Sequence, residues 1–154
     1  MSELEGKAVP AFDMPTADGD RVSAGALKGQ PYVLYFYPKA DTPGCTTEGK
    51  DFSSLMDDFA AAGARVIGVS KDTVKKLSNF KAKHDLTVTL ASDEDESVCE
   101  AFGTWVEKSM YGRTYMGIER ATFLIDAGGV VRKQWPREKV KGHAEEVLQA
   151  VRSL

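Results

Sequence analysis

The sequence predicts an α/β fold, and three observations support that prediction. The apolar run from Tyr32 to Tyr37 is rich in aromatic and β-branched residues, which favours a strand buried on both faces. Apolar residues then recur every three or four positions from Phe52 to Ala60, as in an amphipathic helix. A second apolar strand at 65–70 precedes a second helical pattern from Val74 to Phe80. The order strand, helix, strand, helix is typical of a parallel α/β unit.

Length and composition predict one globular domain spanning residues 1–154. Of the 154 residues, 42% are hydrophobic and 28% are charged, which allows a sizeable core. A net charge of −3 without a basic block interleaved with aromatics gives no reason to expect nucleic-acid binding. No stretch is long enough for a membrane span, and the acidic N-terminus lacks the apolar core of a signal peptide. We therefore expect a cytoplasmic protein that binds no membrane.

The chain has two cysteines, Cys45 and Cys99, which are too few for a secreted disulfide scaffold. In a reducing compartment such a pair is more often catalytic or redox-active. Neither of the two histidines is near a cysteine in the sequence, so we expect no metal site.

Cys45 is the candidate nucleophile because of its predicted position. Pro38 ends the central strand, and Thr42 followed by Pro43 is typical of an N-cap with proline at the first helical position. Cys45 then falls in the first helical turn, where free backbone N–H groups and the helix dipole favour a thiolate. The alternative is a buried structural cysteine, which the surrounding turn residues and hydroxyls disfavour.

The elements around the central strand follow from local patterns. Residues 17–20 form a turn before the short run 21–23, which predicts an N-terminal β-hairpin. Residues 25–29 predict one helical turn. The helix after Cys45 is expected to continue to about Ala62 and to stop at Gly63.

The second half of the chain alternates short elements. Asp72 or Thr73 can cap the second helix, and Leu86 to Ala91 predicts a third strand. A short helix at 98–102 should end at Gly103.

The remaining segments end the chain. Residues 108–117 show no sustained period and predict a loop or a short irregular pair of strands. Segments 121–125 and 130–135 predict a hairpin, and 141–154 predicts a closing helix.

The residues Pro38, Thr42 and Cys45 match the P-x-x-x-T-x-x-C motif, and the chain resembles the peroxiredoxins on this basis. It is most similar to their bacterioferritin comigratory protein (peroxiredoxin Q) branch. The resemblance covers nearly the whole chain, with further matches in V-I-G-V-S-K-D, in I-E-R-A-T-F-L-I-D, which contains Arg120, and in V-K-G-H-A-E-E-V-L.

The resemblance implies a thioredoxin-like fold with a central mixed sheet flanked by helices, and a monomeric enzyme without a cofactor. It implies thiol-dependent reduction of hydrogen peroxide and organic hydroperoxides, with Cys45 as the peroxidatic nucleophile that becomes a sulfenic acid. Thr42 would place its hydroxyl beside the sulfur and the peroxide, Arg120 would supply a fixed cation, and Pro38 would shield the sulfur from water. Thioredoxin or another small thiol would then reduce the sulfenic acid.

The chain departs from this family at the resolving cysteine. The two familiar resolving positions hold Lys50 and Lys81 here. Cys99 has either taken over this role, or it packs in the core and an external thiol resolves Cys45. We favour the second alternative, since Val98 and Phe102 indicate an inward-facing helix and cysteine is often buried.

Other residues leave alternatives open. Glu48 either orients Arg120 or stabilises the helix N-terminus. His84 and His143 are interpreted as surface or capping residues.

A redox-sensing or binding module that does not turn over is the alternative function, motivated by the missing resolving cysteine. A thioredoxin-type disulfide exchanger is disfavoured because Glu48 stands three residues after Cys45, where that chemistry needs a cysteine.

Overall fold

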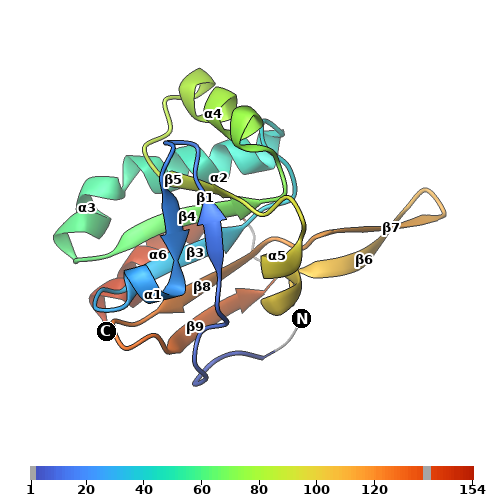
Figure 1. Cartoon of the computed structure of the whole chain (residues 1–154). Helices are drawn as coiled ribbons and strands as arrows, with labels where there is room; N and C mark the ends of the chain where they lie inside the picture. The colour runs from blue at the N-terminus through green and yellow to red at the C-terminus, as the bar shows by residue number, and fades with distance from the viewer. Residues whose placement is uncertain (1–2, 137–139) are drawn as a thin grey trace.

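The computed structural model describes residues 3–136 and 140–154, and within them a five-stranded mixed sheet forms the centre of the molecule (Figure 1). The strand order is β5-β4-β3-β8-β9. The strands are β3 (Tyr32–Phe36), β4 (Arg65–Ser70), β5 (Thr89–Ser92), β8 (Ala121–Ile125) and β9 (Val131–Pro136). The central strand β3 pairs in parallel with β4 and antiparallel with β8, as a buried apolar run predicts.

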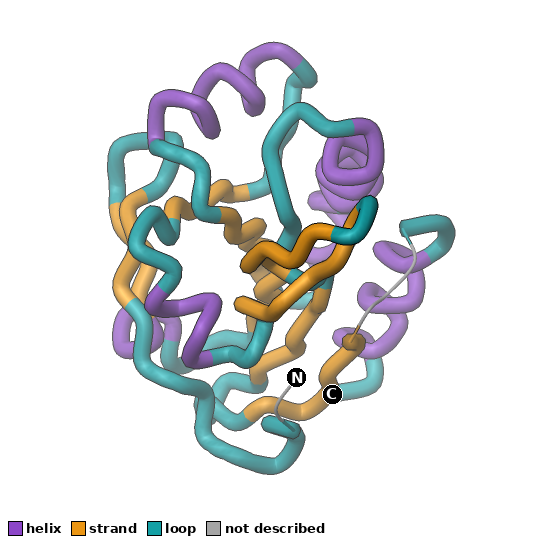
Figure 2. The backbone as a smooth tube through the Cα atoms, turned by 90° about the vertical axis from the view of Figure 1, so that its right-hand side faces the viewer, coloured by secondary structure: helices purple, strands orange, loops and turns teal. Residues whose placement is uncertain are grey.

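One face of the sheet is covered by helices α2 (Pro43–Ser54), α3 (Met56–Ala61), α4 (Val74–Lys83) and α6 (His143–Arg152). Their buried side chains form one core with alternate residues of β3, among them Tyr35. Figure 2 shows helices on both sides of the strands.

The opposite face carries the hairpin of β1 (Asp13–Pro15) and β2 (Arg21–Ser23), together with α1 (Ala24–Leu27) and α5 (Ser97–Ala101). These elements form a second core with the other residues of β3, among them Phe36. The predicted fold class, the N-terminal hairpin and the helical turn before β3 are confirmed.

The helix after Cys45 is not continuous, so the prediction of one helix to Ala62 is wrong. It breaks at Leu55 into α2 and α3. Two serines precede the break: the Ser53 hydroxyl accepts a hydrogen bond from Thr87 N, and the Ser54 hydroxyl donates to Asp51 O. Such side chains compete with helical backbone bonds. The predicted stop is correct, because Gly63 adopts a φ of 80° after α3.

The third strand starts later than predicted, at Thr89 instead of Leu86. The backbone N–H of Leu86 binds Lys81 O at the end of α4, and that of Thr87 binds Ser53. Residues 86–88 therefore contact helices while their apolar side chains stay buried.

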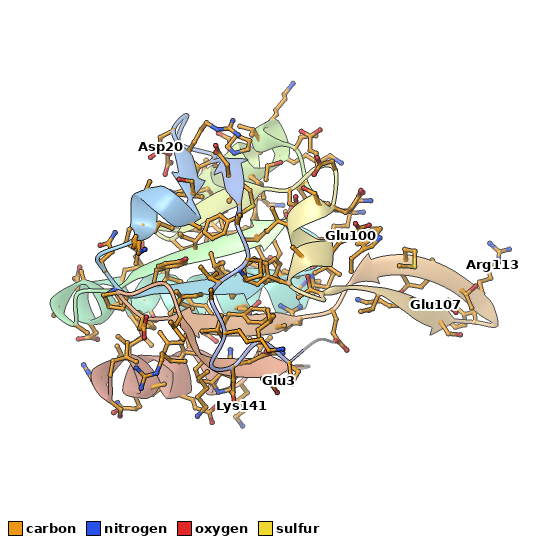
Figure 3. The ribbon with its side chains drawn as sticks, turned by 60° about the horizontal axis from the view of Figure 1, so that its bottom comes forward. Glu3, Asp20, Glu100, Glu107, Arg113 and Lys141 are labelled. Carbon is orange, nitrogen blue, oxygen red and sulfur yellow. The ribbon has the colours of Figure 1, made fainter. Side chains whose placement is uncertain are left out.

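Residues 105–118 form a regular hairpin, β6 (Trp105–Met110) and β7 (Arg113–Ile118), where the sequence predicted a loop or an irregular pair. The turn residues Tyr111 and Gly112 both have positive φ, as tight hairpins require. The hairpin projects from the body, and Figure 3 shows Glu107 and Arg113 on it. Most of its residues are exposed on both faces, so no buried face imposes an alternating pattern.

The other elements are as predicted within a few residues. The β8–β9 hairpin and the closing helix α6 are confirmed. Thr73 caps α4 by accepting from Lys76 N. In the described part of the chain, no helix has the length and apolar composition needed to cross a membrane.

Candidate active site

The loop between β3 and α2 carries the predicted site residues. Pro38 is half-buried in this loop, directly after the buried Tyr37. Asp41 turns the chain with a φ of 64°, and Thr42 occupies the N-cap of α2 with Pro43 at the first helical position. Cys45 therefore lies in the first turn of α2, as predicted.

Thr42 does not cap the helix with its side chain, contrary to the prediction for this residue type. Its hydroxyl instead donates to Lys39 O at 2.8 Å. The donor is used inside the loop, so the oxygen of Thr42 presents its lone pairs as an acceptor.

Arg120 contacts two residues of α2, Cys45 and Glu48. Its Nη2 donates to Cys45 Sγ at 3.3 Å, and its Nη1 donates to Glu48 Oε1 at 2.6 Å. Cys45 is 2% exposed and Glu48 is 1% exposed. Because the side chains of Cys45 and Glu48 are three residues apart, they lie on one face of the helix, and one planar guanidinium reaches both. Of the two interpretations of Glu48, this contact favours orientation of Arg120.

The neighbours of Arg120 favour its charged form. Burial alone would lower the pKa of Arg120, but Glu48 and Cys45 outweigh it and raise the pKa above its ordinary value. Gly44 leaves room for the guanidinium, because a Cβ there would lie 3.2 Å from Arg120 Nη2. The site therefore holds a permanent cation against the sulfur.

Aromatic rings from β3, from the residue after it and from α2 belong to the same core as Cys45. Tyr35 stacks between Tyr37 and Phe52, with ring centroids 5.6 Å and 4.7 Å apart. Burial raises the pKa of Tyr35 and of Tyr37 well above the ordinary range, so both stay neutral. The aromatic cluster is core, as the sequence indicated.

Sequence reasoning missed one residue that positions the loop. Asp72 is buried and its Oδ2 accepts from Ala40 N at 2.8 Å and from Ser70 Oγ at 2.7 Å. The sequence pattern indicates Asp72 only as a possible helix cap. Its position two residues after the buried end of β4 was the available signal.

A protein-family model described as the AhpC/TSA family matches residues 6–134. This chain belongs to the AhpC/TSA family. The chain is 48% identical to a putative peroxiredoxin bcp of Coxiella burnetii over 96% of this chain and 98% of that protein. It is 46% identical to the peroxiredoxin Bcp of Escherichia coli K12, over 93% and 92%. The chain is therefore a peroxiredoxin, a thiol peroxidase, and the resemblance seen in its motifs is confirmed.

Solved structures agree with this assignment. The bacterioferritin comigratory protein of Xanthomonas campestris, studied for alkyl peroxide reduction, matches with a TM-score of 0.88 at 45% identity, over 92% of this chain and 90% of that one. A cysteine-to-serine mutant of Xylella fastidiosa PrxQ matches with a TM-score of 0.93 at 38% identity, over 99% and 98%. The thioredoxin-like fold of peroxiredoxins is therefore confirmed for this chain.

Cys99 of this peroxiredoxin lies away from the site. It is 0% exposed and belongs to the core on the opposite face of the sheet from Cys45. Its backbone N–H donates to Asp93 Oδ2 at 2.7 Å. Burial, and then the neighbouring Asp93, raise the pKa of the Cys99 thiol far above its ordinary value. Both features hold it as a protonated, packed side chain.

The two histidines of this peroxiredoxin differ from each other. His84 is the C-cap residue of α4, consistent with its predicted capping position. His143 is buried, so a surface position is wrong for it: it begins α6 and its Nε2 lies 2.8 Å from Thr122 Oγ1. Burial lowers the pKa of His143 to about 4. In the described residues, no group of three or more His, Cys, Asp or Glu could hold a metal ion.

Proposed function

We propose that this peroxiredoxin reduces hydrogen peroxide and organic hydroperoxides with the thiolate of Cys45 as its nucleophile. The observation that carries the proposal is the 3.3 Å contact from Arg120 Nη2 to Cys45 Sγ. A cation held at the sulfur favours the thiolate before reaction and the negative charge that spreads onto oxygen during it.

In the reaction, the sulfur attacks one peroxide oxygen. An S–O bond forms while the O–O bond breaks, and the second oxygen leaves as hydroxide or alkoxide and takes up a proton. The products are a sulfenic acid at Cys45 and water or an alcohol. The sulfur loses two electrons and the peroxide gains them.

Each neighbouring residue has a distinct part in this proposal. The Thr42 oxygen, whose own proton is donated to Lys39 O, accepts the hydrogen of the bound peroxide and orients it. Glu48 fixes the guanidinium plane through its 2.6 Å contact with Arg120 Nη1. Pro38 shields the sulfur from water in the loop.

We propose that the reducing thiol comes from outside the chain, and that Cys99 is a packing residue. Its burial and its place in the other core support this. The familiar resolving positions support it too: Lys81 binds Asp18 at 2.9 Å, and Lys50 is exposed on α2. Thioredoxin or a small thiol would supply the electrons.

We propose a single-domain monomer as the active form, as the resemblance to the peroxiredoxin Q branch implies. Two free cysteines are in keeping with a cytoplasmic protein. Light scattering with size-exclusion chromatography tests the monomer, and a dimer as the dominant species at micromolar concentration contradicts it.

The decisive experiment measures peroxide consumption with an excess of thioredoxin or of a small thiol. Cys45→Ser should abolish it, while Cys99→Ser should retain it. Unchanged consumption in Cys45→Ser contradicts the proposed nucleophile. Consumption that stops after one equivalent of peroxide per chain, with every reductant, favours the redox-sensing module instead.

A further inference from the structure

A cavity of about 220 Å³ adjoins the loop that leads to Cys45. One wall is the loop itself, and the other is α4, which covers the β5 end of the sheet (Figure 1). The polar side chains that line the cavity are Lys39, Asp41, Asp72, Lys76, Asn79 and Lys83.

The two carboxylates in this cavity are already engaged. Asp41 binds Lys83 Nζ at 2.8 Å and His84 Nε2 at 2.7 Å, and these contacts lower the pKa of Asp41. Asp72 Oδ2 accepts from Ala40 N and Ser70 Oγ. Asp41 is therefore paired with a cation, whereas Asp72 accepts hydrogen bonds from uncharged donors.

Two of the three lysines stay unpaired. Within residues 3–136 and 140–154, neither Lys39 nor Lys76 has a carboxylate within ion-pair distance. Lys39 comes from the loop and Lys76 from α4, so the two lysines line the cavity from opposite walls. The three lysines that line the cavity outnumber its two aspartates, and a concave site with an excess of positive side chains attracts an anion.

The position of the cavity connects it with the second half of the reaction, in which a thiol reduces the sulfenic acid of Cys45. Cys45 is 2% exposed, so its sulfenic acid has to move outward before an external thiol can reach it. Cys45 lies in the first turn of α2, and the loop 38–42 leads directly into that turn. The cavity borders this loop through Lys39, Ala40 and Asp41.

We propose that this cavity binds the carboxylates of a small thiol of the glutathione class and delivers its sulfur to oxidised Cys45. The inference rests on the proposed function, since it concerns the reduction of the sulfenic acid. Lys39 and Lys76 bind the carboxylates as point charges, and Asn79 offers an amide donor.

The reduction balances with two thiols. The first thiolate attacks the Cys45 sulfur, an S–S bond forms, and hydroxide leaves from the sulfur and becomes water. A second thiolate attacks the small-molecule sulfur of this mixed disulfide and releases the Cys45 thiolate. Two small thiols are oxidised to one disulfide for each peroxide reduced.

The test compares glutathione with its diethyl ester, which has the same thiol but blocked carboxylates. Cys45 is first oxidised with one equivalent of peroxide, and the rate of sulfenic acid loss is then measured with each thiol. The rate ratio of acid to ester should fall about three- to tenfold in Lys39→Gln combined with Lys76→Gln. It should stay unchanged in Lys75→Gln, which removes the same charge from an exposed neighbour on α4 that does not line the cavity.

A second measurement needs no variant. S-methylglutathione has the carboxylates but no reactive thiol, so it should slow reduction by glutathione and have little effect on reduction by the diester. The inhibition of reduction by glutathione should weaken with added salt.

The outcomes separate this inference from the proposed function. An unchanged acid-to-ester rate ratio in the double variant, or an equal fall of this ratio in Lys75→Gln, overturns the proposal that the cavity binds the thiol. Reduction by thioredoxin with none by glutathione also overturns it and leaves the peroxidase standing. Failure of peroxide to oxidise Cys45 overturns both.

Discussion

Cys45 and Cys99 lie in two cores that the central sheet separates, Cys45 with α2 and Cys99 with α5. A disulfide needs Cα atoms within about 7 Å, so joining these thiols requires one core to open. We therefore expect one equivalent of peroxide to add one oxygen to the intact mass. Cys99→Ala should give the same product. A loss of two hydrogens within one chain, absent in Cys99→Ala, would show that Cys99 resolves.

Replacing Arg120 tests whether its positive charge accelerates the reaction of Cys45 with peroxide. Arg120→Met removes the charge beside Cys45, and we expect the rate of sulfenic acid formation to fall by about 10²- to 10³-fold. Arg120→Lys should recover only part of this loss, because an ammonium lacks the planar fork that reaches Cys45 and Glu48 together. Rapid mixing with peroxide and trapping of the sulfenic acid give the rates. Equal rates in the methionine variant and the wild type would contradict this account.

Glu48 is expected to act by positioning Arg120. Glu48→Gln keeps an oxygen acceptor for Arg120 Nη1, whereas Glu48→Ala removes it. Sulfenic acid formation should fall about tenfold in the alanine variant and less in the glutamine variant. Thermal unfolding of both variants is the control. If Glu48 only stabilised the fold, the rate would fall in proportion to the unfolding midpoint, whether or not the new side chain can accept a hydrogen bond.

Position 68 requires glycine, because a larger residue there would clash with Tyr35. A Cβ at Gly68 would lie 2.6 Å from the Tyr35 hydroxyl oxygen, and Tyr35 cannot retreat because it is stacked in the core. We expect Gly68→Ala to lower the free energy of unfolding by about 1–3 kcal/mol. Gly25→Ala is the matched control: its Cβ meets open space, and it should be neutral or stabilising by up to about 1 kcal/mol. Urea unfolding measures both, and equal effects would refute the steric argument.

His143 should make stability depend on pH. Burial lowers the pKa of His143 from 6.5 to about 4; Glu146 opposes this shift, and Arg120 adds a smaller lowering. The unfolded chain therefore binds a proton below pH 6.5 that the folded chain takes up only near pH 4. The free energy of unfolding should be fully retained above pH 6.5 and should fall by about 2–3 kcal/mol from pH 6.5 to 4. His143→Gln, which cannot titrate, should flatten this part of the urea-unfolding profile, and an unchanged slope would exclude His143 as its source.

The sequence predicted those features that leave a periodic or local pattern. The buried strand from Tyr32 and the helix start before Cys45 are examples, since burial on both faces and capping chemistry act on neighbouring residues. The position of Arg120 beside Cys45 came from resemblance, because no local pattern connects residues 75 apart.

Features without such a pattern were missed or misassigned. The β6–β7 hairpin has no buried face, and Tyr111 at its turn is 97% exposed, so apolar alternation is absent. The break at Leu55 depends on Ser53 meeting Thr87, which is a tertiary contact. The burial of His143 depends on its contact with Thr122 in the same way.

The contacts of Arg120 have a consequence for the growing chain. They join residues separated by 72 and 75 positions, and the strand β8 that carries Arg120 into place pairs directly with β3. A ribosome-bound chain exposes Cys45 long before Arg120 has been synthesised. Until then the thiol lacks its cation, so activation of the sulfur waits for closure of the sheet, and the reactive centre and the finished fold come into existence together.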